Sequence, residues 1–178
     1  MEVRGVVLVE GVSDRLAVET VARRRGRDLQ AEGVVVVPMG GYGNLPRLLG
    51  RYRGFRIAGL YDVGEERYFL RALGCDDRIG AERAGFYVCS RDLEEELTRA
   101  VGPDGMLNVL EGHGELRAFR TYQKQPAHRD RPLEEQLHGF MWNRKQRYAV
   151  LLVEALDLER VPRPLDRVLR HHDVAGTR

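Results

Sequence analysis

The sequence predicts an α/β protein with a mostly parallel central sheet flanked by helices, followed by a helical C-terminal extension. Over the first hundred residues, short runs dense in valine alternate with segments of helical spacing. Strands that alternate with helices form βαβ units, whose right-handed crossovers place the strands in one parallel sheet. From about Pro103 no valine-rich run recurs until Ala149–Val153, which lies in a helical stretch, so the second half is expected to be helical.

Four strands are predicted from continuous apolar runs, which are typical of strands buried on both faces of a sheet. They are Gly5–Val9, Gly33–Val37, Phe55–Tyr61 and Gly85–Cys89.

A helix is predicted after each strand. The first, Ser13–Arg25, has Ser13 or Asp14 as its expected N-cap and Gly26 just beyond its end. The later predicted helices are Leu45–Tyr52, Glu66–Leu73, Asp92–Val101, Leu107–Leu110, Glu115–Tyr122, Leu133–Phe140 and 143–156. We expect residues 1–102 to form the core, and residues 103–178 to form a helical part packed on the same domain.

The composition excludes several classes of protein. Apolar residues make up 43% and charged residues 31% of the 178 residues, which is typical of a globular chain and not of a disordered one. The net charge of +2 gives no whole-chain signal for nucleic acid, and lysine occurs only at Lys124 and Lys145. No GxxxxGK[ST] motif is present, so we expect no P-loop ATPase in this chain.

Localisation follows from what the sequence lacks. The two cysteines, Cys75 and Cys89, have no CxxC spacing, and the N-terminus does not resemble a signal peptide. No run approaches the ~20 apolar residues that span a bilayer. We expect a cytoplasmic protein without membrane contact, and we expect His171 and His172 to lie in a frayed tail.

Acidic residues follow the first and third predicted strands. Glu10 and Asp14 come after the first strand, and Asp62, Glu65 and Glu66 come after the third. Ligands of parallel sheets bind beyond the carboxyl ends of the strands, so these carboxylates are expected to share one edge. Oxygen ligands of this kind suit Mg²⁺ or Mn²⁺. Each residue also has a structural explanation, because Asp14 can cap its helix and the two glutamates can belong to a helical first turn.

A glycine-rich loop follows the second predicted strand. Gly40, Gly41 and Gly43 in this loop leave backbone amides exposed that could approach a phosphate. Glycines also close turns in most α/β folds, so the loop alone is a weak signal.

Three consecutive segments carry a family resemblance: VVLVEGVSDRLAVETVA, VVVVPMGGYGNL and IAGLYDVGEE. They resemble the toprim domain of the OLD (overcoming lysogenisation defect) nucleases, and the resemblance continues through NRKQRYAVLLVEALDLERVPRPL. It implies a toprim, Rossmann-like fold and metal binding by Glu10, Asp14 and Asp62. It also implies that Lys145 is the basic residue that OLD-type proteins carry on a late helix.

The resemblance implies hydrolysis of nucleic acid, with DNA the expected substrate, using two Mg²⁺ or Mn²⁺ ions. Glu10 and Asp62 would hold one ion, and Asp14 with Glu65 or Glu66 the other. Glu10 is also a candidate general acid or base, and Lys145 would stabilise negative charge in the transition state. Lys145 could equally be an ordinary surface lysine.

Phosphate contacts are expected from the Arg-rich C-terminal part, with Arg144 and Arg147 as candidates. A solvated basic face explains such arginines as well as DNA binding does.

Two departures from the family pattern leave a second hypothesis open. Gly64 stands where the family has the second acid of a DxD motif, and the ATPase of OLD nucleases is absent from the chain. The alternative is a catalytically weak or inactive toprim module that binds nucleic acid or a separate partner ATPase.

Overall fold

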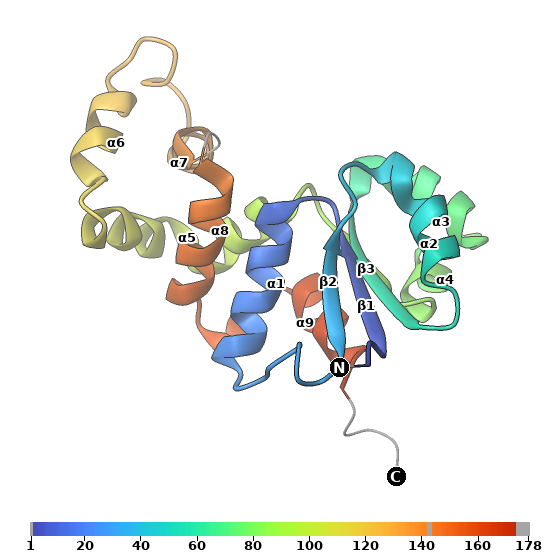
Figure 1. Cartoon of the computed structure of the whole chain (residues 1–178). Coiled ribbons are helices and arrows are strands. Elements are labelled where there is room, and N and C mark those ends of the chain that lie inside the picture. Colours follow the sequence, from blue (N-terminus) through green and yellow to red (C-terminus); the bar gives the residue numbers. More distant parts are fainter. Residues whose placement is uncertain (1, 142–143, 174–178) are drawn as a thin grey trace.

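The computed structural model describes residues 2–141 and 144–173 and has an α/β architecture (Figure 1). Its described strands form one parallel sheet in the order β2-β1-β3-β4. They are β1 (Gly5–Val9), β2 (Val34–Pro38), β3 (Arg56–Asp62) and β4 (Phe86–Cys89). The predicted fold class is confirmed, and each predicted strand lies within one residue of an observed one.

Helices cover both faces of the sheet (Figure 1). One face carries α2 (Leu45–Arg51), α3 (Glu66–Leu73) and α4 (Arg78–Arg83), and the other carries α1 (Val12–Arg24) and α9 (Arg163–Arg170). Successive side chains of β1 alternate between the two cores, because strand residues point to opposite faces. Val6 and Leu8 pack on the α2 side, and Val7 and Val9 pack on the α1 side.

The second strand is less buried than its sequence predicts. Val34 is buried, but Val35, Val36 and Val37 are only half-buried. The reason is that β2 is an edge strand of the sheet, paired only with β1 among the described strands. A continuous valine run therefore does not distinguish a central strand from an edge strand.

The long helix α5 (Leu93–Gly112) contains a kink. Gly102 has a φ of 73° and is followed by Pro103, so the helix axis changes direction there and a second helical segment continues to Gly112. The structure thus replaces the predicted short helix Leu107–Leu110 by a longer one. The kink falls at the predicted boundary after residue 102, although the division into two parts remains a prediction.

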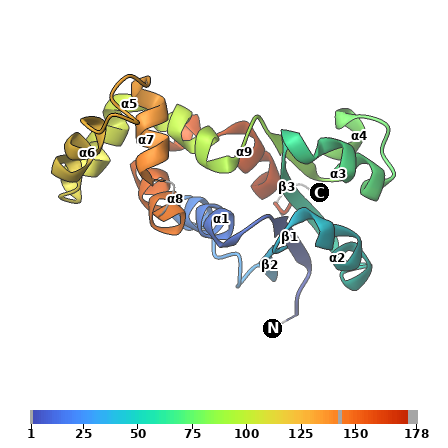
Figure 2. The same ribbon diagram turned by 90° about the horizontal axis from the view of Figure 1, so that it is seen from above.

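The remaining helices are α6 (Leu116–Gln123), α7 (Leu133–Met141) and α8 (Lys145–Ala155). α8 packs against both α1 and α5. α6 and α7 extend away from the sheet, as seen from above in Figure 2, and we call residues 115–141 the α6–α7 lobe. Residues 142–143 lie outside the described part of the chain, and the last predicted helix starts at the second of them.

The C-terminal segment returns to the sheet. α9, which the sequence did not predict, packs against β3 and β4. The His172 side chain is 3% exposed, and a Cβ added to Gly5 would lie 2.5 Å from its Nδ1 atom. The expectation of a frayed tail at this position is therefore wrong. Within the described residues, no helix combines the length and the apolar character needed to cross a membrane.

Candidate active site

A pocket of about 410 Å³ opens at the carboxyl edge of the sheet. Its walls come from the ends of β1, β2 and β3 and from the first turns of α1, α5 and α8. The lining residues are Glu10, Gly11, Ser13, Asp14, Gly40, Gly41, Asp62, Asp92, Leu93, Glu94 and Lys145. The structure therefore brings together residues that are up to 135 positions apart in sequence, from Glu10 to Lys145.

Asp14 is held in this pocket by the start of α1. Gly11 is the N-cap of the helix, with φ of −136°, and its backbone N–H donates to the Asp14 carboxylate at 2.8 Å. The predicted N-cap, Ser13 or Asp14, is wrong, because Asp14 lies one turn further and reaches back to the cap. Burial and the nearby Glu94 raise the pKa of Asp14 to about 7.

Asp62 ends β3 and faces Glu10, the exposed residue that follows β1. Burial, and then the charge of Glu10, raise the pKa of Asp62 well above its usual value. Burial and Glu10 also raise the pKa of Glu65 to about 7, and one carboxylate oxygen of Glu65 is buried without a hydrogen-bond partner. Carboxyl groups with raised pKa values that face one another gain most from a bound cation.

Glu66 is not part of this group. Its carboxylate receives two hydrogen bonds from the Arg78 guanidinium, at 2.6 and 3.0 Å, and Arg78 holds the pKa of Glu66 below its usual value. Of the two glutamates that the sequence offered, the structure places only Glu65 beside Glu10.

The glycine loop reaches the pocket in part. Gly40 and Gly41 line it, with φ values of 68° and 109° that favour glycine, whereas Gly43 does not. The Gly40 N–H already donates to the carbonyl of Glu10 at 3.1 Å, so it is not available to a phosphate. This contact removes Gly40 from the expected set of phosphate-binding amides.

Lys145, the first residue of α8, lines the same pocket as the carboxylates, and its charge acts on Asp14. Its Nζ lies 3.5 Å from Oε1 of Glu94, and the hydroxyl of Ser13 donates to the same oxygen at 3.0 Å. The side chain of Lys145 is 30% exposed. It is therefore a partly buried cation at the pocket wall, which differs from an ordinary surface lysine.

Arg144 and Arg147 have a different environment. Both pair with Glu115, with nitrogen–oxygen distances of 2.7 and 2.5 Å, and the Tyr148 hydroxyl also donates to this carboxylate. Glu115 is 8% exposed. The structure thus shows both arginines partnered by Glu115, and neither lines the pocket.

The sequence reasoning missed two acidic residues of the pocket. Asp92 accepts the backbone N–H of Glu95 at 2.7 Å as the N-cap of α5, and Glu94 pairs with Lys145. Asp92 and Glu94 lie three and five residues after the end of β4, while Glu10 directly follows β1 and Asp62 is the last residue of β3. The presence of acidic residues shortly after a parallel strand was the signal that could have identified Asp92 and Glu94. Both residues also suit the N-terminus of a helix, and that explanation was sufficient from sequence alone.

The fit of a divalent metal depends on chemistry and on geometry. The oxygen donors, their raised pKa values and the unpartnered Glu65 oxygen all suit a hard cation. Among the described residues, however, no three acidic, histidine or cysteine side chains lie close enough to ligate one ion as they stand. Mg²⁺ commonly takes only one or two protein carboxylates and keeps several waters, so these residues fit it without such a cluster.

Comparisons with known proteins agree with this fold. Residues 3–60 match the model of the OLD-like toprim domain, described as "Overcoming lysogenization defect protein-like, TOPRIM domain". No curated protein matches the chain significantly.

Solved structures of OLD C-terminal regions are similar over nearly the whole chain. The region from Burkholderia pseudomallei superposes with a TM-score of 0.73 at 19% identity, covering 97% of this chain and 98% of the other. That from Xanthomonas campestris pv. campestris, phased with iodine, gives a TM-score of 0.69 at 25% identity, covering 96% and 94%. The toprim fold and the resemblance to OLD C-terminal regions are thereby shown.

Proposed function

We propose, from the OLD-like toprim domain in residues 3–60 and the pocket at its carboxyl edge, that the protein hydrolyses phosphodiester bonds in nucleic acid. The observation that carries this proposal is the meeting of Glu10, Asp14, Asp62 and Glu65 at one edge of the sheet, beside a pocket that Lys145 also lines. Toprim domains generally bind divalent metals, and the OLD family is associated with nucleases.

We propose that Glu10, Asp14, Asp62 and Glu65 hold two Mg²⁺ or Mn²⁺ ions, each bound by one or two of these carboxylates and otherwise by water. When bound, the metal would polarise the scissile phosphate and lower the pKa of the attacking water. In this proposal the scissile diester lies beside these carboxylates, and Glu10, which is exposed and lines the pocket, is the candidate general acid or base.

Lys145 has a distinct part in this proposal. Its ammonium group is held in the pocket by Glu94, and Glu94 is in turn oriented by Ser13. A cation fixed in advance stabilises the negative charge that develops on the phosphate oxygens without moving during the reaction. We place Lys145 in contact with the reacting phosphate and Glu94 behind it as a positioning residue.

One observation favours the second candidate, a module that binds nucleic acid or a partner ATPase without cleaving. Gly64 stands where the family pattern has a second acid, and a Cβ added there would meet nothing within 4 Å. Position 64 therefore has room for the acidic side chain of the family pattern, but it carries no carboxylate. A protein with only the remaining carboxylates would bind metal weakly and cleave slowly.

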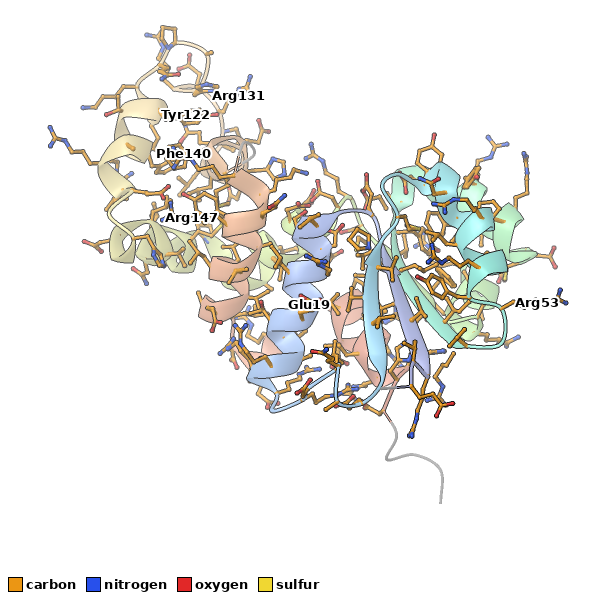
Figure 3. The ribbon with its side chains drawn as sticks, in the orientation of Figure 1. Glu19, Arg53, Tyr122, Arg131, Phe140 and Arg147 are labelled. Atoms are coloured by element: carbon orange, nitrogen blue, oxygen red, sulfur yellow. The ribbon has the colours of Figure 1, made fainter. Side chains whose placement is uncertain are left out.

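The test is cleavage of supercoiled plasmid and of a labelled oligonucleotide with Mg²⁺ or Mn²⁺. Wild type is compared with Glu10→Ala and with the matched control Glu19→Ala, which changes an exposed glutamate on the outer face of α1 (Figure 3). We expect cleavage by wild type and Glu19→Ala, and loss of at least about 100-fold in Glu10→Ala.

The outcomes separate the two candidates. No cleavage by wild type, together with metal-independent binding of the oligonucleotide, supports the non-catalytic module. Equal cleavage by wild type and Glu10→Ala overturns the assignment of this pocket and points to a contaminating nuclease.

A further inference from the structure

The exposed face of α6 carries a row of positive charges. Arg117, Arg120 and Lys124 are spaced three and four residues apart, which places them on one side of the helix. With a rise of 1.5 Å per residue, the row is about 10 Å long. All three side chains are exposed, and Lys124 is the second of the chain's two lysines.

These charges are not neutralised by neighbouring acids. None of the three forms an ion pair with a carboxylate in the part of the chain that the structure describes, and Arg120 donates only to the neutral side chain of Gln123, at 2.8 Å. α6 itself contains no acidic residue. Of the acids nearest in sequence, Glu115 is buried and pairs with Arg144 and Arg147, and Asp130 pairs with Arg129. Glu111, in the last turn of α5, is exposed, and within the described residues it forms no ion pair with the row.

The opposite face of α6 anchors the helix, so the row cannot rotate inward. Phe119 is fully buried and lies 5.3 Å, centroid to centroid, from the Phe140 ring of α7. Tyr122 lies 5.5 Å from the same Phe140 ring and stacks on His128 at 3.9 Å, and Figure 3 shows Tyr122 and Phe140 within the lobe. A Cβ at Gly139 would meet the Tyr122 hydroxyl at 2.5 Å, so this glycine permits the close approach of the two helices.

The lobe projects on the side of the molecule toward which the strands point (Figure 1). That is also the side on which the carboxylate pocket opens, since the pocket lies at the carboxyl ends of the strands. α8 connects the two places, because its first residue is Lys145 and the preceding lobe is tied to its first turn through Glu115. The pocket and the lobe thus lie on the same side of the molecule and are joined through α8.

We infer that the face of α6 formed by Arg117, Arg120 and Lys124 binds the sugar–phosphate backbone of a nucleic acid, and so extends the substrate site beyond the pocket. This inference rests on the proposed function for the identity of the ligand. The exposed face holds Arg117, Ala118, Arg120, Thr121 and Lys124, without a large apolar side chain. Protein interfaces are centred on apolar and aromatic residues, whereas phosphate contacts use Arg, Lys and Thr, so the composition favours nucleic acid over an acidic protein.

The test measures binding without metal, so that cleavage does not interfere. A labelled single strand and a labelled duplex of about 40 nucleotides are titrated in EDTA over a range of KCl concentrations. Wild type is compared with the triple variant Arg117→Gln, Arg120→Gln, Lys124→Gln. The matched control is Arg47→Gln, Arg53→Gln, Arg71→Gln, which removes three exposed arginines that form no ion pair with any described residue. Arg53 lies at the opposite end of the molecule from the lobe (Figure 3), and Arg47 and Arg71 belong to α2 and α3 at the same end (Figure 1).

Each phosphate contact adds roughly 0.7 to 0.9 to the slope of log Kd against log salt concentration. We expect the α6 triple variant to bind at least about tenfold more weakly than wild type, with a slope lower by about two. The control variant is expected to lose far less affinity for the labelled nucleic acids. Equal losses in both variants, an unchanged slope, or no binding by wild type at low salt would overturn the inference.

A small diester separates this inference from the proposed function. Bis(p-nitrophenyl) phosphate with Mn²⁺ is too short to reach the lobe from the pocket. We expect the three proteins to hydrolyse it at similar rates while the α6 triple variant cleaves the long substrates more slowly. If the small diester is hydrolysed but wild type and the α6 triple variant bind the long substrates equally well, only the inference about the α6 surface is overturned. If the two proteins differ in binding but neither hydrolyses the diester, only the nuclease function is overturned.

Discussion

The ammonium nitrogen of Lys145 lies 3.5 Å from the Glu94 carboxylate oxygen that also accepts the Ser13 hydroxyl. This arrangement joins α8, α5 and α1, three helices that are far apart in sequence, at one wall of the pocket. It fixes the position of a cation in the pocket that the carboxylates at the ends of β1 and β3 also line.

Removing this cation should lower the rate of cleavage without weakening metal binding. For Lys145→Met we expect a loss of about 100-fold in kcat, because a preorganised charge on the transition state is worth a few kcal/mol. Metal affinity, measured by calorimetry with Mn²⁺, should be unchanged or higher, because a positive charge near the metal is lost. Arg53→Met is the control, and an equal loss of kcat in both variants would contradict the role of Lys145.

Asp14 should make the metal-free protein less stable at higher pH. Its pKa is raised from 3.8 to about 7 in the folded protein, so the native state retains its proton over a range where the unfolded state has lost it. The free energy of unfolding therefore falls as pH rises from about 4 to about 7. In EDTA at pH 8, Asp14→Asn should be more stable than wild type by on the order of 2 kcal/mol, and this difference should vanish below about pH 4.

Urea denaturation across this pH range measures the effect, with Asp76→Asn, at an exposed aspartate, as the control. Adding Mg²⁺ at pH 8 should make wild type more stable than Asp14→Asn, because the ion stabilises only the protein that binds it. A constant difference between wild type and Asp14→Asn over the whole pH range would contradict this account.

Restoring the missing acid should strengthen the metal site. Gly64 does not have a φ in the left-handed region, and a Cβ there meets no atom within 4 Å, so Gly64→Asp can be accommodated. We expect a higher affinity for Mn²⁺, by about tenfold, and faster hydrolysis of the small diester. Gly64→Asn has nearly the same shape without the charge, and an equal effect of both variants would show that the added carboxylate is not responsible.

The Glu115 carboxylate should hold the α6–α7 lobe to α8. It is 8% exposed and pairs with Arg144, Arg147 and Tyr148. Glu115→Gln removes one member of a partly buried charge network, and we expect it to lower the free energy of unfolding by about 2 kcal/mol.

Chemical denaturation measures this loss, and Glu134→Gln, at an exposed glutamate of α7, is the control. Hydrogen exchange should show the added opening in α6 and in the first turn of α8, rather than in the sheet. Uniform destabilisation of the sheet and the lobe would argue against a local tether.

The sequence alone was sufficient to predict the α/β class, the four strands and three of the carboxylates that meet in the pocket. Valine runs and helical spacing are local properties, and parallel strands bring their carboxyl ends to one edge whatever the details of packing. Glu10, Asp14 and Asp62 could be grouped for this reason. Lys145, however, was selected by family resemblance and by the scarcity of lysine, and not by any local pattern.

Only the tertiary structure decided which neighbours those residues have. It placed Glu65, but not Glu66, beside Glu10, because Arg78 of α4 takes the second glutamate. It added Glu94 to the pocket. The half-buried state of β2 and the burial of His172 against Gly5 also come from packing between elements. Contacts between distant segments depend on the orientation of side chains in the folded molecule, and residue spacing along a chain does not encode that orientation locally.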